Sequence, residues 1–163
     1  MTRSFDEIRN LPQDPGIYGL KSPTDVKDGT YSYVGLSGNI RNRVNQHLVR
    51  RNSSVTTGAS ATSLNPDKIS ECNWWWHKTF AKQEYLEAAE LIAFEKLNPT
   101  LGSRGSPGSA ALELSQDKDF ISQIEELFSS PPTGFIVFHD LSWAVSKIRE
   151  LENEIKLLKE KLK

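Results

Sequence analysis

Five side chains in this sequence have the types and spacing needed for chemistry on a phosphate group. Tyr18 and Tyr33 lie in the short segments Gly-Ile-Tyr and Tyr-Val-Gly, Arg43 and His47 follow the second segment four residues apart, and Glu90 comes later. An arginine can neutralise phosphate charge, a carboxylate can hold a metal ion, and a phenol can handle an attacking water. The set suits phosphoryl transfer, whereas a carboxylate dyad, a glycine-rich phosphate loop and a Ser-His-Asp set are missing from the sequence.

Two neighbouring strands must hold the tyrosines. Residues 16–21 and 31–36 alternate apolar and other residues, and turn-forming residues separate the two stretches. This pattern predicts antiparallel strands joined by a long hairpin loop. Tyrosines on neighbouring strands can share one face of a sheet, where both hydroxyls could touch one ligand.

Two helices must hold the other three side chains. Residues 37–39 supply capping side chains for a basic helix, on which Arg43 and His47 lie one turn apart and can both point toward the sheet edge. A second helix is predicted over residues 83–98, ended by the proline that follows. Glu90 lies on or beside the apolar arc of this helix, and a carboxylate in that position needs a partner.

The other segments give weaker signals. Residues 52–68 have the composition of a mobile loop, and the aromatic residues 72–77 predict a third strand in which at least one tryptophan faces the core. Residues 101–108 indicate a flexible connector, followed by an amphipathic helix that begins near Ser115. Residues 135–138 could be a strand or the lead-in to the last helix.

The end of the chain carries a heptad pattern. Seven apolar residues sit alternately three and four apart with lysine and glutamate between them: Leu141, Ala144, Ile148, Leu151, Ile155, Leu158 and Leu162. This spacing favours a coiled coil, which would join two copies or bind another protein. The same stretch could instead pack back on the domain as a single amphipathic helix.

Composition limits the class of protein. A length of 163 residues allows one compact domain with an appendage. No stretch approaches about 18 apolar residues and residues 1–10 lack a secretory pattern, so we expect no membrane span and a cytoplasmic location. One cysteine and three scattered histidines argue against zinc. A net charge of −1 means that any contact with nucleic acid must come from a local patch.

The motifs together resemble the GIY-YIG nuclease family, which includes phage homing endonucleases, some restriction enzymes and the bacterial excision-repair incision subunit. The resemblance covers residues 14 to about 102. Gly16-Ile17-Tyr18 matches the first name motif, and Tyr33-Val34-Gly35 matches the second with a conservative valine.

The resemblance extends to the two helices. Arg43 matches the family arginine, and His47 matches a histidine that many members carry one turn later. Glu90 matches the family glutamate, because an apolar residue and then Asn98-Pro99 follow it as in homing and repair members. Many relatives carry an asparagine where this chain has Gly102, which puts local substrate contacts in question.

The family resemblance implies a fold and a set of roles. The fold is α+β, a small three-stranded antiparallel sheet flanked by helices. A single Mg2+ or Mn2+ ion would bind Glu90, Arg43 would contact the scissile phosphate, and Tyr18 with Tyr33 would order or deprotonate the water. Glu87, one turn before Glu90, is the alternative metal ligand if the helix aligns differently.

We therefore expect a metal-dependent DNA endonuclease whose catalytic set includes His47. The expected parts are a nuclease-like domain over residues 1–110, a helical and short-strand extension over 111–139 and a coiled-coil helix over 140–163. Further arginines are expected to contact the nucleic acid, namely Arg41, Arg50, Arg51 and Arg104. The alternatives are a non-catalytic nucleic-acid-binding or recruitment module, in which the coiled coil brings in a partner, and an oligomerisation adaptor.

Overall fold

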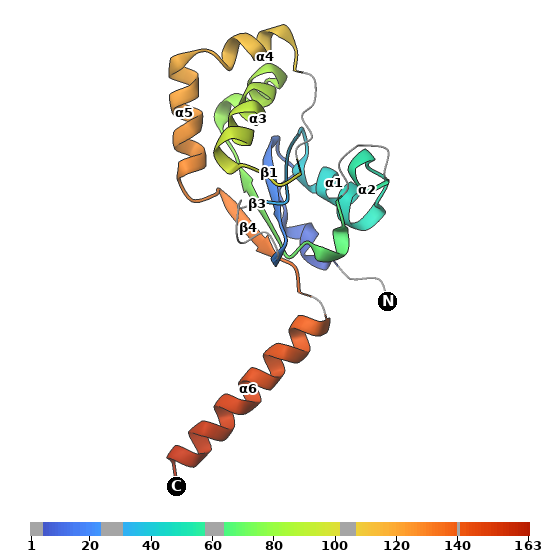
Figure 1. Cartoon of the computed structure of the whole chain (residues 1–163), viewed down its shortest axis with the longest axis vertical. Helices are drawn as coiled ribbons and strands as arrows, with labels where there is room; N and C mark the ends of the chain where they lie inside the picture. Colours follow the sequence, from blue (N-terminus) through green and yellow to red (C-terminus); the bar gives the residue numbers. More distant parts are fainter. Residues whose placement is uncertain (1–4, 24–30, 58–63, 102–106, 140) are drawn as a thin grey trace.

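A four-stranded antiparallel sheet forms the centre of the fold (Figure 1). The computed structural model describes residues 5–23, 31–57, 64–101, 107–139 and 141–163. Residues 141–143 are described by their backbone alone. The strands are β1 (Gly16–Lys21), β2 (Tyr33–Ser37), β3 (Glu71–Trp75) and β4 (Gly134–Val137). Their order is β2-β1-β3-β4, so β2 and β4 are the edges.

The α+β class is confirmed, but the prediction of three strands was wrong. The run that the sequence left undecided is β4, which pairs with β3 from Glu71 opposite Val137 to Trp74 opposite Gly134. Four apolar residues are too few for their period to separate a strand from a helix start. The run forms a strand because β3 would otherwise have an unpaired edge, whose backbone N–H and C=O groups need partners.

Helical elements cover both faces of the sheet. One face carries η1 (Asp6–Asn10), α1 (Ile40–Asn45), its π-helical continuation η3 (Gln46–Arg50), α2 (Ser54–Thr57) and η4 (Pro66–Lys68). The opposite face carries η5 (Lys78–Ala81), α3 (Gln83–Leu97), α4 (Ser109–Leu114) and α5 (Lys118–Ser129). Each side has its own hydrophobic cluster.

Alternation along the strands divides the side chains between these two clusters. Tyr18 and Tyr33 pack beneath α1, whereas Ile17 and Trp75 pack beneath α3. Trp75 is the fully buried tryptophan of the three, and the next one, Trp76, is half exposed. The sheet therefore separates the tyrosines from α3, and the two sides can meet only around an edge.

The predictions for two helical regions need correction. Residues 52–68, predicted as a loop, contain α2 and η4 in their described parts. The helix expected from near Ser115 begins at Lys118, where the Asp117 side chain accepts a hydrogen bond of 3.0 Å from the Phe120 backbone N–H. The helix α4 before it was not predicted, because six residues are too few to show a helical period.

Residues 111–139 share a core with the sheet. Ala111, Ile124 and Phe128 belong to the cluster beneath α3, and the Phe128 ring meets Trp75 edge-on at 5.4 Å between centroids. The last helix, α6 (Leu141–Lys161), extends away from these layers (Figure 1). Among the described residues, no helix combines the length and the apolar character that crossing a membrane requires.

Candidate active site

A pocket of about 290 Å³ lies beside the edge strand β2, where helices from both faces of the sheet come together. Its polar lining includes Tyr33 from β2, Arg43 from α1, and Gln83, Glu87 and Glu90 from α3. Three of the five predicted catalytic side chains thus line one pocket, together with the alternative metal ligand. Because β2 is an edge strand, a residue of α3 can lie near residues of the opposite face there.

The two tyrosines occupy one face of the sheet, but only one lines the pocket. Tyr18 pairs with Gly35, and Tyr33 lies two residues from that glycine, which places the ring centroids 6.1 Å apart. Tyr18 is completely buried, whereas Tyr33 faces the pocket. A Cβ on Gly35 would lie 2.6 Å from the Tyr18 hydroxyl oxygen, so the glycine leaves room for this phenol.

His47 lies behind Tyr18 and does not line the pocket. The imidazole is fully buried, with Nε2 2.7 Å from the Tyr18 hydroxyl and Nδ1 2.8 Å from Ser53 Oγ. Burial, helped by the nearby Arg43 charge, lowers the pKa of His47 to about 3. The ring is therefore neutral at physiological pH and is placed to orient Tyr18 rather than to touch a substrate.

Arg43 lies among the phenols. Its Nη1 donates a hydrogen bond of 2.8 Å to Gln46 Oε1, and the guanidinium also hydrogen bonds to Tyr18 and Tyr33. Burial raises the pKa of both phenols, and the Arg43 charge acts against this rise. Both tyrosines are therefore neutral at physiological pH, and the guanidinium is the permanent positive charge facing the pocket.

The two carboxylates of α3 have different surroundings. Glu87 accepts hydrogen bonds of 3.2 Å each from Gln83 Nε2 and from the Gly108 backbone N–H. Burial raises the pKa of Glu90 to about 7; a hydrogen bond from the Leu36 backbone N–H opposes this rise, and the Glu87 charge adds to it. A half-buried carboxylate beside a second one is a position that a cation would stabilise.

The carboxylates fit a magnesium-type ion. Among the described residues, no group of three or more His, Cys, Asp or Glu side chains could hold a metal. An ion at Glu90, with Glu87 nearby, would therefore take its other ligands from water or substrate. Magnesium commonly binds in this way, through one or two carboxylates, several waters and phosphate oxygens.

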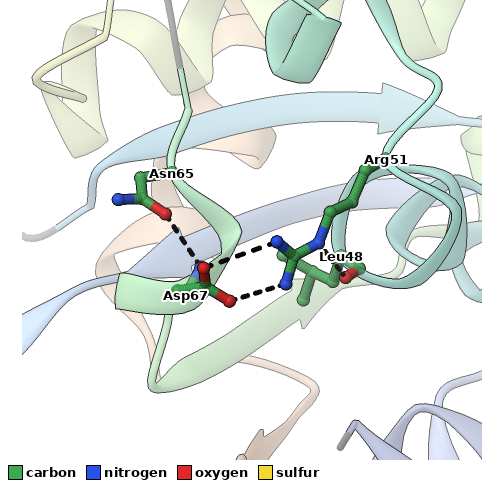
Figure 2. Close-up of polar contacts among 4 residues, drawn as sticks. All are labelled: Leu48, Arg51, Asn65 and Asp67. Atoms are coloured by element: carbon green, nitrogen blue, oxygen red, sulfur yellow. Dashed lines mark hydrogen bonds and ion pairs between the residues drawn. The ribbon is translucent and has the colours of Figure 1, made fainter. Parts of the chain in front are cut away.

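Arg51, predicted to contact nucleic acid, has an internal partner (Figure 2). Its guanidinium lies 2.6 Å and 3.4 Å from the two carboxylate oxygens of Asp67, and Nε donates to the Leu48 carbonyl oxygen. Asp67 in turn donates its backbone N–H to the Asn65 side chain at 3.1 Å. Arg51 also ends η3 with a left-handed backbone, φ 53°, so its contacts join that helix to η4.

The other predicted nucleic-acid contacts differ in their settings. Arg41 Nε donates a hydrogen bond of 2.8 Å to the Leu11 carbonyl oxygen, which ties α1 to the N-terminal segment. Arg50 is exposed at the end of η3. Arg104, like Gly102, lies outside the described residues. Of the three arginines that the structure describes, Arg50 is thus the exposed one, whereas Arg41 and Arg51 are partly buried.

The sequence of this chain is similar to protein C of the UvrABC system. The protein of Legionella pneumophila strain Paris is 33% identical over 151 residues, which cover 90% of this chain and 24% of the relative, and the strain Lens protein has the same values. The chain thus spans about a quarter of the length of these relatives. No family model matches the chain, and no solved structure matches it.

Sequence reasoning missed Ser53 and Thr56, which lie in the segment predicted to be a loop. Ser53 is buried against His47, and Thr56 contacts Ser53 through a hydroxyl–hydroxyl distance of 2.9 Å. Their small polar side chains gave no periodic signal. The available hint was that a buried histidine needs a partner for each ring nitrogen.

Replacing Glu90 by glutamine is expected to stabilise the metal-free protein at alkaline pH. The pKa of Glu90 in the folded state, about 7, lies above its usual 4.5, so folding takes up a proton between these values and Glu90 costs more stability as pH rises through them. With chelator present, the free energy of unfolding of Glu90→Gln in urea should exceed that of wild type by roughly 1 to 3 kcal/mol at pH 8. At pH 4, below both pKa values, the difference should be only about 0.2 kcal/mol. His47 titrates in both proteins, so its contribution cancels; an equal difference at both pH values would contradict the assignment.

Proposed function

We propose that this chain is a DNA endonuclease of the GIY-YIG type, which hydrolyses phosphodiester bonds with one divalent ion, Mg2+ or Mn2+. The main support for the proposal is that one pocket is lined by Tyr33, Arg43 and Glu90, which come from three separate elements. The similarity to protein C of the UvrABC system agrees with the motif resemblance, since the family includes the bacterial excision-repair incision subunit.

The pocket suggests a division of roles. Arg43 would bind the scissile phosphate through its fixed charge and paired N–H groups, and Glu90 would hold the ion, with Glu87 beside it. Tyr33 would contact the attacking water, because it faces the pocket while Tyr18 lies beneath it. The bound ion would act as a Lewis acid on the phosphate.

Metal removal tests this proposal directly. We expect the purified chain to nick supercoiled plasmid or branched DNA with Mg2+ or Mn2+, to stop when chelator is added, and to recover when metal is restored in excess. The measurement is the fraction of cut DNA over time on a gel. Cutting that is unaffected by chelator would contradict the role of the ion, and binding without any cutting would contradict the nuclease.

A recruitment module is the second candidate. It is favoured by α6, whose described side chains from Val145 onward are exposed and include a row of apolar residues. In that case the pocket would recognise a nucleic acid without cleaving it. The buried environment of Glu90 favours the enzyme, because a binder gains nothing from a half-buried carboxylate in a site for a polyanion.

A further inference from the structure

Helix α6 exposes a row of large apolar side chains. Ile148, Leu151, Ile155 and Leu158 are each between 46% and 58% exposed, and the helix extends away from the sheet and its helices (Figure 1). These residues recur at alternating spacings of three and four, which brings them onto one side of the helix. A continuous apolar row of this kind marks an interaction surface.

The residue types in the row favour a coiled coil of two helices. Isoleucine occupies the a positions, 148 and 155, and leucine occupies the d positions, 151 and 158. β-Branched residues at a with leucine at d favour parallel dimeric coiled coils. The row therefore indicates the number of helices, whereas their orientation depends on the charges that flank it.

The charges that flank the row agree with a parallel orientation. In a parallel pair in register, each g residue faces the e residue of the next heptad on the other helix. Lys147 would then face Glu152 of the second copy, and Glu154 would face Lys159. Both contacts join opposite charges.

An antiparallel pair would set like charges together. In an antiparallel pair, a residues of one helix lie opposite d residues of the other, which makes the pairing symmetric about residue 153. Glu152 would then lie near Glu152 of the second copy, and Glu154 near Glu154 of the second copy. In the single chain, Lys147 Nζ lies 3.3 Å from the Glu150 carboxylate, an exposed contact that is weak enough to exchange. The charge pattern thus favours the parallel arrangement.

We propose that α6 forms a parallel, in-register, two-stranded coiled coil with a second copy of this chain. Each dimer would carry two of the pockets described above. A membrane surface is a less suitable occupant, because charges of both signs flank the apolar row on each side. This proposal does not depend on the nuclease proposal, since its test measures association alone.

Cysteines placed in the row test the arrangement in the full chain. Residues at the same d position of two parallel helices face each other, so Leu151→Cys and Leu158→Cys should each yield a disulfide-linked dimer on mild oxidation. The native Cys72 is buried and should not interfere. Lys156→Cys, on the outer side of the helix, is the matched control and should stay unlinked.

A charge exchange supplies the second measurement. Glu152→Lys should weaken association in sedimentation equilibrium by about tenfold or more, because it faces Lys147. The double change Lys147→Glu with Glu152→Lys should restore it. A monomer at all concentrations, cross-linking at neither d position, or a monomer that sediments with anionic vesicles would overturn the proposal.

A second inference rests on the polar contacts behind the pocket. Tyr18 Oη contacts His47 Nε2 at 2.7 Å, and His47 Nδ1 contacts Ser53 Oγ at 2.8 Å. Ser53 Oγ contacts Thr56 Oγ1 at 2.9 Å, and Thr56 Oγ1 lies 3.0 Å from the Ser53 carbonyl oxygen. A neutral imidazole and three hydroxyls provide one polar hydrogen each for these four contacts.

The count of hydrogens gives the chain of contacts a direction. The Ser53 carbonyl has no hydrogen, so Thr56 must donate to it. The Ser53 hydroxyl must then donate to Thr56, His47 Nδ1–H must donate to Ser53, and the Tyr18 hydroxyl must donate to Nε2. The hydrogen of Tyr18 is thus engaged with His47, which leaves only the Tyr18 oxygen to meet the Arg43 guanidinium, a group that can only donate.

We infer that Ser53 and Thr56 are positioning residues that hold His47 as the Nδ1–H tautomer and keep the Tyr18 hydroxyl hydrogen directed toward Nε2. The oxygen of Tyr18 is then held as an acceptor for the Arg43 guanidinium. If the proposed function holds, this contact helps to position the guanidinium that would bind the scissile phosphate. The tautomer itself can be tested without any cleavage.

Nitrogen NMR of the His47 ring gives that test. Wild type should show a protonated Nδ1 and an unprotonated Nε2. Thr56→Val keeps the shape of the side chain but removes the terminal donor, so Ser53 can donate to Nδ1 and a mixture of tautomers should appear. Thr56→Ser keeps the hydroxyl and should resemble wild type.

Cleavage provides the second readout. Thr56→Val should slow DNA cutting by about tenfold, while Thr56→Ser stays near wild type. A protonated Nε2 in wild type, or an unchanged tautomer in Thr56→Val, would overturn the inference. If the tautomer shifts as expected but no variant cuts DNA, the proposed function fails while the assignment of the hydrogen bonds stands.

Discussion

Replacing Glu90 by alanine is expected to lower the rate of DNA cleavage by about a thousandfold while leaving DNA binding nearly unchanged or slightly improved. Glu90 is the half-buried carboxylate of the pocket, and its raised pKa indicates a site where a cation would be favourable. Its removal takes away the expected metal ligand and a negative charge, but it leaves Arg43 in place. Initial cleavage rates and a gel-shift titration would measure the two effects separately.

Matched variants on α3 make this result specific. Glu87→Ala removes the other pocket carboxylate, which already accepts hydrogen bonds from Gln83 and Gly108. We expect a smaller loss from Glu87→Ala, and almost none from Glu95→Ala, because Glu95 is exposed on the same helix. A larger loss for Glu87→Ala than for Glu90→Ala would transfer the role of main metal ligand to Glu87.

Replacing Arg43 by alanine is expected to reduce cleavage by roughly 100- to 1,000-fold, since it removes the fixed positive charge that lines the pocket beside Tyr33. Arg43→Lys keeps a charge but loses the paired N–H groups, so an intermediate rate is expected. Single-turnover cleavage at saturating protein would separate this catalytic loss from weaker binding.

Arg50→Ala is the control for Arg43. Arg50 is exposed at the end of η3, so its loss should weaken DNA binding modestly without changing the rate at saturation. The free energy of unfolding of both variants should also be measured in urea, because Arg43 hydrogen bonds to Gln46 and its loss could lower stability. Equal single-turnover rates for Arg43→Ala and wild type would remove Arg43 from the catalytic machinery.

Local patterns were enough to place most elements of the site. The two tyrosine strands, the basic helix and the helix of Glu90 are all present close to their expected bounds. Strand alternation, capping residues and the Asn98-Pro99 stop act within a few residues of the elements they mark. The run that forms β4 was left undecided and the helix α4 was missed, because short runs carry no period.

Residue types and spacing by themselves determined which side chains could form the site, since each motif lies within one strand or helix. Only the tertiary structure decided that Tyr33 faces the pocket while Tyr18 lies beneath it, that His47 is joined to Ser53, and that Arg51 pairs with Asp67. These outcomes depend on contacts between separate elements. Burial, free strand edges and the pairing of charges settle such contacts, and no local pattern records them.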